Sequence, residues 1–157
     1  NILCFILSLA AVSIYILRSS EGAGQALLYF AIAVCISSDI GGYVFGKSIG
    51  GKKLTKISPN KTISGAIGSF LFSIIPLVLF NYHDQNEYSF TFNNFSFCLI
   101  VSLVCQLGDL FISYIKRKAK VKNTGTFLPG HGGLLDRVDG IIFAIPVVFI
   151  LKIIQIF

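Results

Sequence analysis

The sequence predicts an all-α integral membrane protein, a polytopic bundle of transmembrane helices. Of its 157 residues, 54% are hydrophobic and 13% are charged, and the mean hydropathy is +0.79, whereas soluble domains carry roughly 25% charged residues. A helix needs roughly 20 mostly apolar residues to cross a bilayer core. Five stretches approach that length: 1–17, 24–46, 63–81, 95–115 and 138–157. We therefore expect about five spans, which use most of the chain.

We expect a single transmembrane domain over residues 1–157, because no internal repeat or low-complexity linker divides the sequence. The first residue, Asn1, opens an apolar stretch that lacks the basic segment and cleavage site of a signal peptide. We therefore interpret the sequence as the C-terminal part of a longer chain.

The four cysteines all lie inside the apolar stretches. They are Cys4, Cys35, Cys98 and Cys105. Because no CxxC or Cys/His spacing suits zinc, we expect them to be small core residues.

The net charge of +6 is concentrated in two connections, which hold eleven of the thirteen Lys and Arg residues. The first connection contains Lys47, Lys52, Lys53, Lys56 and Lys61, and the second contains Lys116, Arg117, Lys118, Lys120, Lys122 and Arg137. With alternating helices both connections fall on one side of the membrane, and an excess of Lys and Arg marks the cytoplasmic side. Nucleic-acid binding is therefore a poor explanation of the basic charge.

Two glycine clusters lie on this same side, one where the second span ends and one just before the last span. The first comprises Gly41, Gly42, Gly46, Gly50 and Gly51, and the second comprises Pro129, Gly130, Gly132 and Gly133. Glycine permits close approach of the backbone to a ligand, although glycine and proline also punctuate helix ends. Because both clusters share one side, we favour the ligand interpretation.

Four aspartates lie where a charge is disfavoured. Asp39 follows fifteen largely apolar residues, Asp109 lies well inside 95–115, and Asp136 and Asp139 open the last span. An Asp at the centre of a span costs about 2.5–3.5 kcal/mol on insertion scales. Acids at membrane depth are therefore candidates for a functional site.

Helical spacing places Gly132, Asp136 and Asp139 on one face, at i, i+4 and i+7. Two carboxylates so close need a positive partner, which is either Arg137 with the Lys-rich connection or a divalent cation. Carboxylates beside clustered lysines favour Mg²⁺ holding a phosphate, since Mg²⁺ binds through one or two acids plus the oxygens of its substrate.

Two stretches resemble motifs without meeting their requirements. Residues 41–48, GGYVFGKS, satisfy GxxxxGK[ST], but a P-loop joins a buried strand to a helix, and these residues are flanked by membrane spans. Residues 136–140 open like the DxxDG motif of CDP-alcohol phosphotransferases. Phe143 and Ala144 stand where that motif has Ala and Arg, and no later acid follows, so the match fails.

From Ser113 to Asp139 the chain reads SYIKRKAKVKNTGTFLPGHGGLLDRVD. This stretch closely resembles the motif S-x-[apolar]-K-R-x4-K-D-x-[small]-x2-[apolar]-[PG]-x-H-G-G-[apolar]-x-D-R-x-D of the phosphatidate cytidylyltransferases, the CDP-diacylglycerol synthases. The one departure is Asn123, where the family has Asp. A match over 27 residues is very specific.

Residues 39–68 resemble a second block of that family, D-x-x-A-Y-x-x-G followed by SP-x-KT-x-EG-x-x-G. The matching positions are Asp39, Tyr43, Gly46, Ser58, Pro59, Lys61, Thr62, Gly65 and Gly68. Two positions depart: Ser64 stands where Glu is common, and Gly42 where Ala is common. Together with Gly108 and Asp109, the resemblance covers roughly residues 25–157.

The resemblance implies transfer of CMP from CTP to phosphatidate, giving CDP-diacylglycerol and pyrophosphate, with Mg²⁺ as the cofactor. It implies metal binding by Asp109, Asp136, Asp139 and Asp39. It implies catalytic contacts from Lys61, Lys122, His131 and Arg137, and phosphate contacts from Ser58, Lys116, Arg117, Gly132 and Gly133. Ordinary decoration of a cytoplasmic face is the alternative explanation for Lys52, Lys53, Lys118 and Lys120.

The residues suit this chemistry independently. A lipid phosphate monoester has a second pKa of about 6 and needs no general base to attack phosphorus. The barrier is electrostatic, because two polyanions must meet, and basic loops beside aspartates supply cations and metal ligands against that charge.

The expected location is a bacterial inner membrane with the site facing the cytoplasm, and the expected partners are CTP, phosphatidate and the bilayer. A homodimer is left open. A CTP-dependent lipid kinase, a CDP-archaeol-type synthase and a homologue without activity are alternatives. A transporter fits less well, because the acids crowd one face instead of bridging the bilayer.

Overall fold

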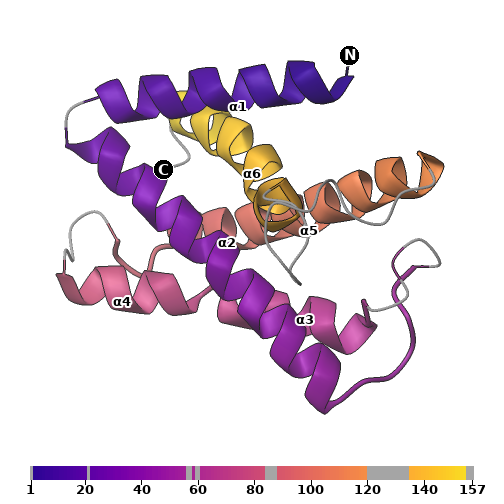
Figure 1. Ribbon diagram of the computed structural model, residues 1–157. Coiled ribbons are helices and arrows are strands. Elements are labelled where there is room, and N and C mark those ends of the chain that lie inside the picture. The colour runs from indigo at the N-terminus through magenta and orange to yellow at the C-terminus, as the bar shows by residue number, and fades with distance from the viewer. Residues whose placement is uncertain are drawn as a thin grey trace.

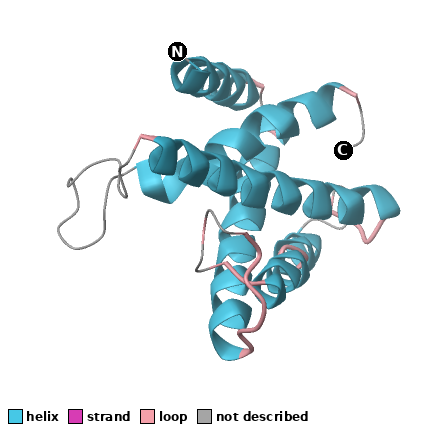
Figure 2. Cartoon of the chain, turned by 90° about the vertical axis from the view of Figure 1, so that its right-hand side faces the viewer, coloured by secondary structure: helices cyan, strands magenta, loops and turns pink. Residues whose placement is uncertain are grey.

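The computed structural model describes residues 2–20, 22–55, 58, 61–83, 88–119 and 135–154, and for residues 2, 3 and 135–137 it describes the backbone alone. These residues form six helices: α1 (Ile2–Ser19), α2 (Ala23–Ser48), α3 (Ile63–Phe72), α4 (Ile75–His83), α5 (Phe92–Lys118) and α6 (Leu135–Ile153) (Figure 1). Within those ranges there is no strand, only one isolated bridge between Lys53 and Thr62 (Figure 2). The predicted all-α class is confirmed.

The helices coincide with the five predicted spans, with ends that differ by a few residues. Three helical stretches in the described ranges are long and apolar enough to cross a membrane: Ala23–Ser48, Ile63–His83 and Phe92–Lys118. α1 is apolar but shorter over Cys4–Ser19, and α6 carries four charged residues in its 19. The protein is therefore a polytopic membrane helix bundle.

The stretch predicted as one span over 63–81 is interrupted by a turn. α3 ends at Phe72 and α4 begins at Ile75. Pro76 has no N–H, so the carbonyl of Phe72 cannot receive the usual helical hydrogen bond. The Ser73 hydroxyl donates to the Phe70 carbonyl at 2.7 Å inside this turn. The predicted span is nevertheless confirmed, because Ile63–His83 as a whole is long and apolar enough to cross a membrane, and Pro76 accounts for the turn inside it.

Glycines let α2 and α3 cross at close range. A methyl group added at Gly68 would lie 2.5 Å from Phe45 Cβ, and one added at Gly65 would lie 2.8 Å from the Gly42 carbonyl oxygen. Small residues in membrane helices allow such backbone contact. Gly41, Gly42 and Gly46 therefore serve helix packing between α2 and α3.

Residues 41–48 form the helical end of α2, with no phosphate-binding loop. The chain turns immediately afterwards, where Gly50 and Gly51 have φ angles of 64° and 106°. Such angles suit glycine. The rejection of a P-loop is confirmed.

An aromatic cluster fills the core between α2, α4 and α5. The Phe30 ring centroid lies 5.7 Å from that of Phe97, 5.2 Å from that of Phe80 and 4.9 Å from that of Tyr88. Three cysteines, Cys35, Cys98 and Cys105, are buried in this core as predicted, whereas Cys4 is exposed on α1.

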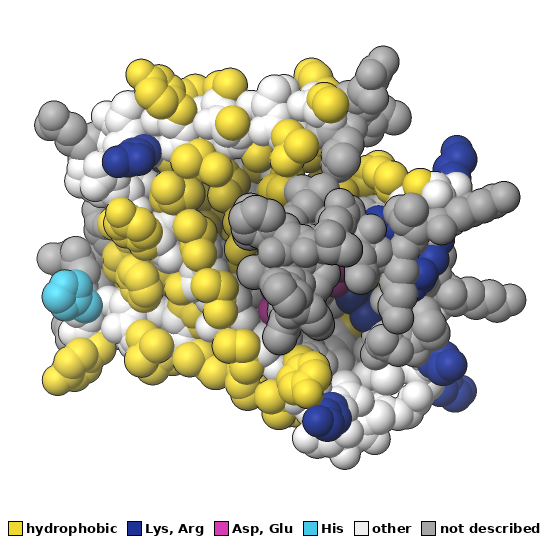
Figure 3. Space-filling model, viewed as in Figure 1, with side chains coloured by type: hydrophobic (Ala, Val, Ile, Leu, Met, Phe, Trp, Pro, Cys, Tyr) yellow, Lys and Arg dark blue, Asp and Glu magenta, His cyan; other side chains and the backbone are white. Residues whose placement is uncertain are grey.

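The basic residues gather at one end of the bundle. α2 ends, α3 begins and α5 ends at the right of Figure 1, and most Lys and Arg side chains visible in Figure 3 lie on that side. The predicted clustering of the two basic connections is therefore consistent with the fold.

The α2–α3 crossing gives a stability prediction. Gly68→Ala should destabilise the protein by about 1–3 kcal/mol, because its methyl overlaps Phe45 and the Gly41 carbonyl. The measurement is thermal unfolding of the purified protein in detergent. Ile67→Ala, at a 55% exposed position on the same helix, is the control and should change stability little. Equal stability of parent and Gly68→Ala would contradict the close crossing.

Candidate active site

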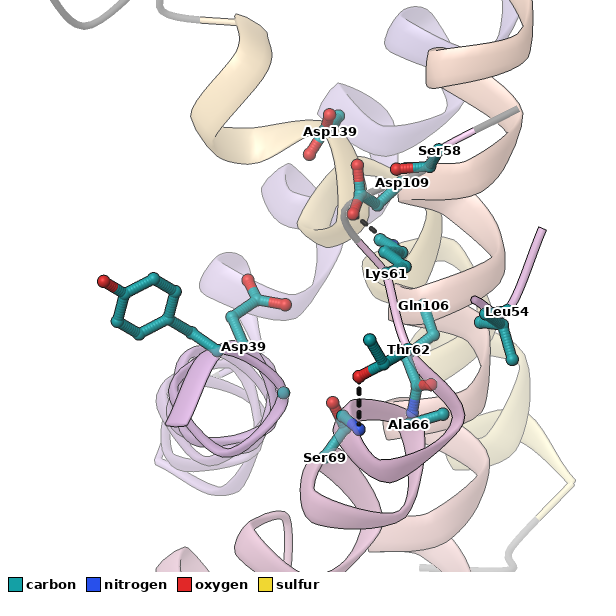
Figure 4. Close-up of a pocket in the computed structure, with 13 residues that line it drawn as sticks. Asp39, Leu54, Ser58, Lys61, Thr62, Ala66, Ser69, Gln106, Asp109 and Asp139 are labelled. Atoms are coloured by element: carbon teal, nitrogen blue, oxygen red, sulfur yellow. Dashed lines mark hydrogen bonds and ion pairs between the residues drawn. The ribbon is translucent and has the colours of Figure 1, made fainter. Parts of the chain in front are cut away.

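A cavity of about 380 Å³ lies at the basic end of the bundle (Figure 4). α2, α3, α5, α6 and the connection between α2 and α3 all contribute to its wall. The lining residues are Asp39, Gly42, Tyr43, Leu54, Ser58, Lys61, Thr62, Gly65, Ala66, Ser69, Gln106, Asp109 and Asp139. Three carboxylates from three different helices therefore share one cavity.

Asp109 on α5 forms an ion pair with Lys61 (Figure 4). Lys61 is held by the connection, which folds back on itself: Leu54 N donates to the Lys61 carbonyl at 2.8 Å, and Ile63 N donates to the Lys52 carbonyl at 3.0 Å. Both partners keep about a third of their surface exposed, at 27% for Lys61 and 32% for Asp109. The pair therefore remains accessible from the cavity.

Thr62 ends this connection by capping α3. Its hydroxyl accepts a hydrogen bond from Gly65 N at 3.1 Å, which satisfies one free N–H of the first helical turn. The cap fixes the backbone immediately after Lys61. The backbone at Lys61 is thus held by its hydrogen bond to Leu54 and by the helix cap at the next residue.

Asp139 on α6 is only 7% exposed and lies 3.7 Å from the ammonium of Lys116 on α5. Gly140 brings the two helices together, because a methyl there would lie 2.5 Å from the Cys105 sulfur. Figure 4 shows the Asp139 carboxylate beside that of Asp109. Two acids and two lysines therefore form one charge cluster.

Asp39 on α2 is exposed and lies further from this cluster. Its carboxylate accepts a long hydrogen bond from the Cys105 thiol, with 3.9 Å between sulfur and oxygen. The Asp39 side chain thus forms part of the cavity wall and is more exposed to solvent than that of Asp139.

A chain of polar side chains runs from the cavity into the core. The Ser38 and Ser102 hydroxyls hydrogen-bond at 2.7 Å between α2 and α5, and the Gln106 amide donates to Ser102 at 3.3 Å. Both serines are fully buried. This chain orients Gln106, which lines the cavity.

The donor set fits a hard divalent cation. Carboxylate oxygens suit Mg²⁺, which retains several waters and uses only one or two acids directly. No group of three or more His, Cys, Asp or Glu residues is close enough to enclose a metal within the described residues. An open site completed by water and substrate oxygens is the arrangement these residues can form.

The structure brings together five of the predicted site residues, Asp39, Ser58, Lys61, Asp109 and Asp139, around the cavity. Lys116 reaches Asp139. Arg117 is exposed at the end of α5 and does not line the cavity.

The remaining predicted positions lie outside what the structure describes. Lys122, His131, Gly132 and Gly133 fall outside the described residues, and Asp136 and Arg137 are described only as backbone in the first turn of α6. Asn123 also lies outside. Ser64, the other departure from the family pattern, donates its hydroxyl to the Gly50 carbonyl and does not line the cavity.

Sequence reasoning missed Gln106 and Ser69 as lining residues. Each had a signal: Gln106 is a polar residue three positions before Asp109 in an apolar stretch, and Ser69 follows Gly65 by one helical turn. Nothing in the sequence marked Leu54 as a lining residue, because its position depends on how the connection between α2 and α3 folds.

The fold and the cavity define a class, the polytopic α-helical membrane proteins with a site of acids and lysines at one end of the spans. The chain belongs to the Cytidylyltransferase family, whose model matches residues 1–155. The resemblance noted in the sequence is thereby confirmed.

Several similar proteins are named phosphatidate cytidylyltransferase. That of Rickettsia bellii (strain RML369-C) is 40% identical over 150 residues, covering 90% of this chain and 64% of that protein. That of Staphylococcus aureus (strain COL) is 41% identical over 152 residues, covering 94% and 58%. That of Bacillus subtilis (strain 168) is 37% identical over 136 residues, covering 86% and 50%. The chain thus spans between half and two thirds of the length of these relatives.

The Lys61–Asp109 pair leads to a prediction about metal binding. If Asp109 binds a divalent cation as the sequence predicts, that cation competes with the Lys61 ammonium for the carboxylate, so Lys61→Gln should tighten binding of Mn²⁺ to the nucleotide-free protein about fivefold, the scale of a partly exposed ion pair. Electron paramagnetic resonance of free Mn²⁺ measures this affinity. Lys118→Gln, an equal charge change at an exposed position, is the control. Weaker Mn²⁺ binding in Lys61→Gln would show that Lys61 does not compete with the metal.

Proposed function

We propose that this protein transfers CMP from CTP to phosphatidate, forming CDP-diacylglycerol and pyrophosphate. The observation that carries the proposal is the cavity at the basic end of membrane-spanning helices, where Asp109 pairs with Lys61 and Asp139 lies near Lys116. Family membership and the names of the similar proteins support it.

The reaction joins two anionic phosphates. An oxygen of the phosphatidate phosphate attacks the α-phosphorus of CTP, and the bond from that phosphorus to the oxygen bridging to the β-phosphate breaks, so pyrophosphate leaves. The attacking monoester has a second pKa of about 6 and is already ionised at neutral pH. The site must therefore supply positioning and positive charge instead of a general base.

The lysines serve this purpose by changing partners. Without substrate, Lys61 and Lys116 pair with Asp109 and Asp139. When substrate phosphates enter the cavity, the ammonium groups turn to the phosphate oxygens. Ser58, on the cavity wall, donates a further hydrogen bond to phosphate.

The rest of the phosphate site comes from the second basic connection. Lys122, His131 and Arg137 contact the reacting phosphates, while Arg117, Gly132 and Gly133 contribute to phosphate binding. The support for these roles is their match to the family motif between Ser113 and Asp139.

Asp109, Asp136, Asp139 and Asp39 would hold Mg²⁺, which supplies positive charge against the phosphates of both substrates. The support is the shared cavity of three of these acids and the helical spacing that places Asp136 one turn before Asp139.

The basic end of the bundle faces the cytoplasm of a bacterial inner membrane, where CTP is available. The excess of Lys and Arg at that end supports this orientation, and the similar proteins are bacterial. Single cysteines placed in a cysteine-free variant test it: a membrane-impermeant reagent should label position 85 and not position 53 in intact cells. Labelling at position 53 in intact cells would show that the protein has the opposite orientation.

The reaction is tested with CTP labelled at either the α- or the γ-phosphate, added with phosphatidate to the purified full chain. The α-label should enter lipid and the γ-label should not. Transfer of the γ-label would identify a lipid kinase, and absence of both products would indicate a homologue without activity.

The role of the acids gives a quantitative prediction. Asp136→Asn and Asp139→Asn should each lower turnover about a hundredfold or more while the protein still inserts and folds, the usual loss for a group that stabilises transition-state charge. Turnover and thermal stability are measured together, with Asp84→Asn as the matched control outside the motif. Poor stability with full specific activity would instead assign these acids to structural ion pairs.

A further inference from the structure

One face of α2 is exposed, apolar and continuous up to the basic end of the bundle. Ile36 is 48% exposed, Ile40 is 51% exposed and Tyr43 is 66% exposed, and Lys47 is exposed in the last turn. Spacings of four, three and four residues place these side chains along one side of the helix. The face thus consists of an apolar strip that ends in a phenol and an ammonium.

The cavity opens onto this face. Tyr43 lines the cavity and is also exposed. Asp39, one position before Ile40, lines the cavity and is exposed too. A molecule lying on this side of α2 therefore borders the Asp39 carboxylate without passing through the packed core.

Tyr43 and Lys47 form a polar pair at the end of the strip. The Lys47 ammonium donates to the Tyr43 hydroxyl at 3.2 Å. The accepting hydroxyl keeps its own proton, which it can donate to another oxygen. The pair therefore presents several N–H and O–H donors beside the part of the cavity wall that Tyr43 forms, a set that suits a phosphate group.

We propose that this face, Ile36, Ile40, Tyr43 and Lys47, is the docking surface for a single membrane lipid with a phosphate monoester headgroup. The phosphate binds Lys47 and the Tyr43 hydroxyl, and an acyl chain lies against Ile40 and Ile36. The identification of this lipid as phosphatidate rests on the proposed function.

The dimensions support a lipid as the occupant. Lys47 lies eleven positions after Ile36, which corresponds to about 16 Å of helix. This is close to half of a hydrocarbon core of about 30 Å, the depth that one acyl chain occupies. A water-soluble phosphate would gain nothing from the exposed isoleucines, so the strip and the cation together favour a lipid.

An ordinary interfacial lysine is the competing explanation of Lys47, since such residues decorate the cytoplasmic ends of spans. That explanation predicts no preference among lipids at Ile40. The two explanations therefore differ in lipid selectivity at a defined position on the strip.

The sequence contains no tryptophan, so Ile40→Trp introduces a single fluorophore on the strip. The protein is reconstituted into vesicles of phosphatidylcholine with a small fraction of either brominated phosphatidate or brominated phosphatidylcholine. We expect brominated phosphatidate to quench the fluorescence severalfold more strongly than brominated phosphatidylcholine. Adding Lys47→Gln or Tyr43→Phe should remove most of that preference, whereas adding Lys118→Gln should preserve it.

Leu79→Trp provides the matched position, because Leu79 is 63% exposed on α4 and does not line the cavity. Quenching there should be the same for both lipids. Equal quenching by both lipids at Ile40→Trp would overturn the proposal.

Kinetics give a second, separate test. In mixed micelles, Lys47→Gln should raise the KM for phosphatidate about fivefold, the effect of one cation on an anionic lipid, and leave the KM for CTP unchanged. A raised KM for CTP alone would assign Lys47 to the nucleotide and overturn the proposal.

The two tests separate this inference from the proposed function. If the parent forms no CDP-diacylglycerol but phosphatidate is still preferred at Ile40→Trp, the docking surface stands and the proposed reaction fails. If CDP-diacylglycerol forms but no lipid preference is found, the reaction stands and the docking surface fails.

Discussion

The need to neutralise carboxylates at membrane depth organises this protein. An isolated Asp at the centre of a span costs about 2.5–3.5 kcal/mol, and a positive partner beside Asp109 and Asp139 lowers the cost of such a charge. Lys61 and Lys116 are these partners. Lys61 is brought to α5 by the connection between α2 and α3, and Asp139 is brought to α5 by α6. The ion pairs therefore determine which segments must meet at the basic end of the bundle, and the cavity lies where they meet.

Close packing elsewhere makes that meeting possible. Gly42 and Gly65 let the backbones of α2 and α3 approach, and Gly140 does the same for α6 against Cys105. Bulkier residues would separate α2 from α3 and α6 from α5, and with them the side chains from these helices that line the cavity. The buried Ser38–Ser102 hydrogen bond also joins α2 to α5. The glycine contacts and the buried hydrogen bond thus determine how closely the helices pack. The helix packing in turn determines the distances between the charged side chains of the cavity.

The sequence predicted the parts of this arrangement that depend on composition along the chain. The spans follow from hydropathy, and Asp39, Asp109 and Asp139 stood out because charge is rare in apolar stretches. It did not predict the features that depend on tertiary contacts. The turn at Ser73 required weighing Pro76 against a continuous apolar stretch, and the pairing of Lys61 with Asp109 required the fold of the connection. Ser64 shows the same limit: the motif fixes its place in the sequence, whereas only the fold shows that its hydroxyl donates a hydrogen bond to the Gly50 carbonyl.

The charge balance of the cavity also explains why lysines suit the proposed reaction. A site built of acids alone would repel CTP and a lipid phosphate, and a site built of lysines alone would hold both products tightly. Paired acids and lysines are nearly neutral before substrate arrives, which limits the cost of placing them beside the hydrocarbon core. In the proposed reaction, Asp109 and Asp139 would hold a divalent cation, which would supply positive charge against the phosphates, while Lys61 and Lys116 would contact the phosphate oxygens. The pairing that neutralises these acids beside the hydrocarbon core therefore uses the same residues that the proposed reaction would need for phosphate binding, and the partial exposure of Lys61 and Asp109 leaves their ion pair accessible from the cavity.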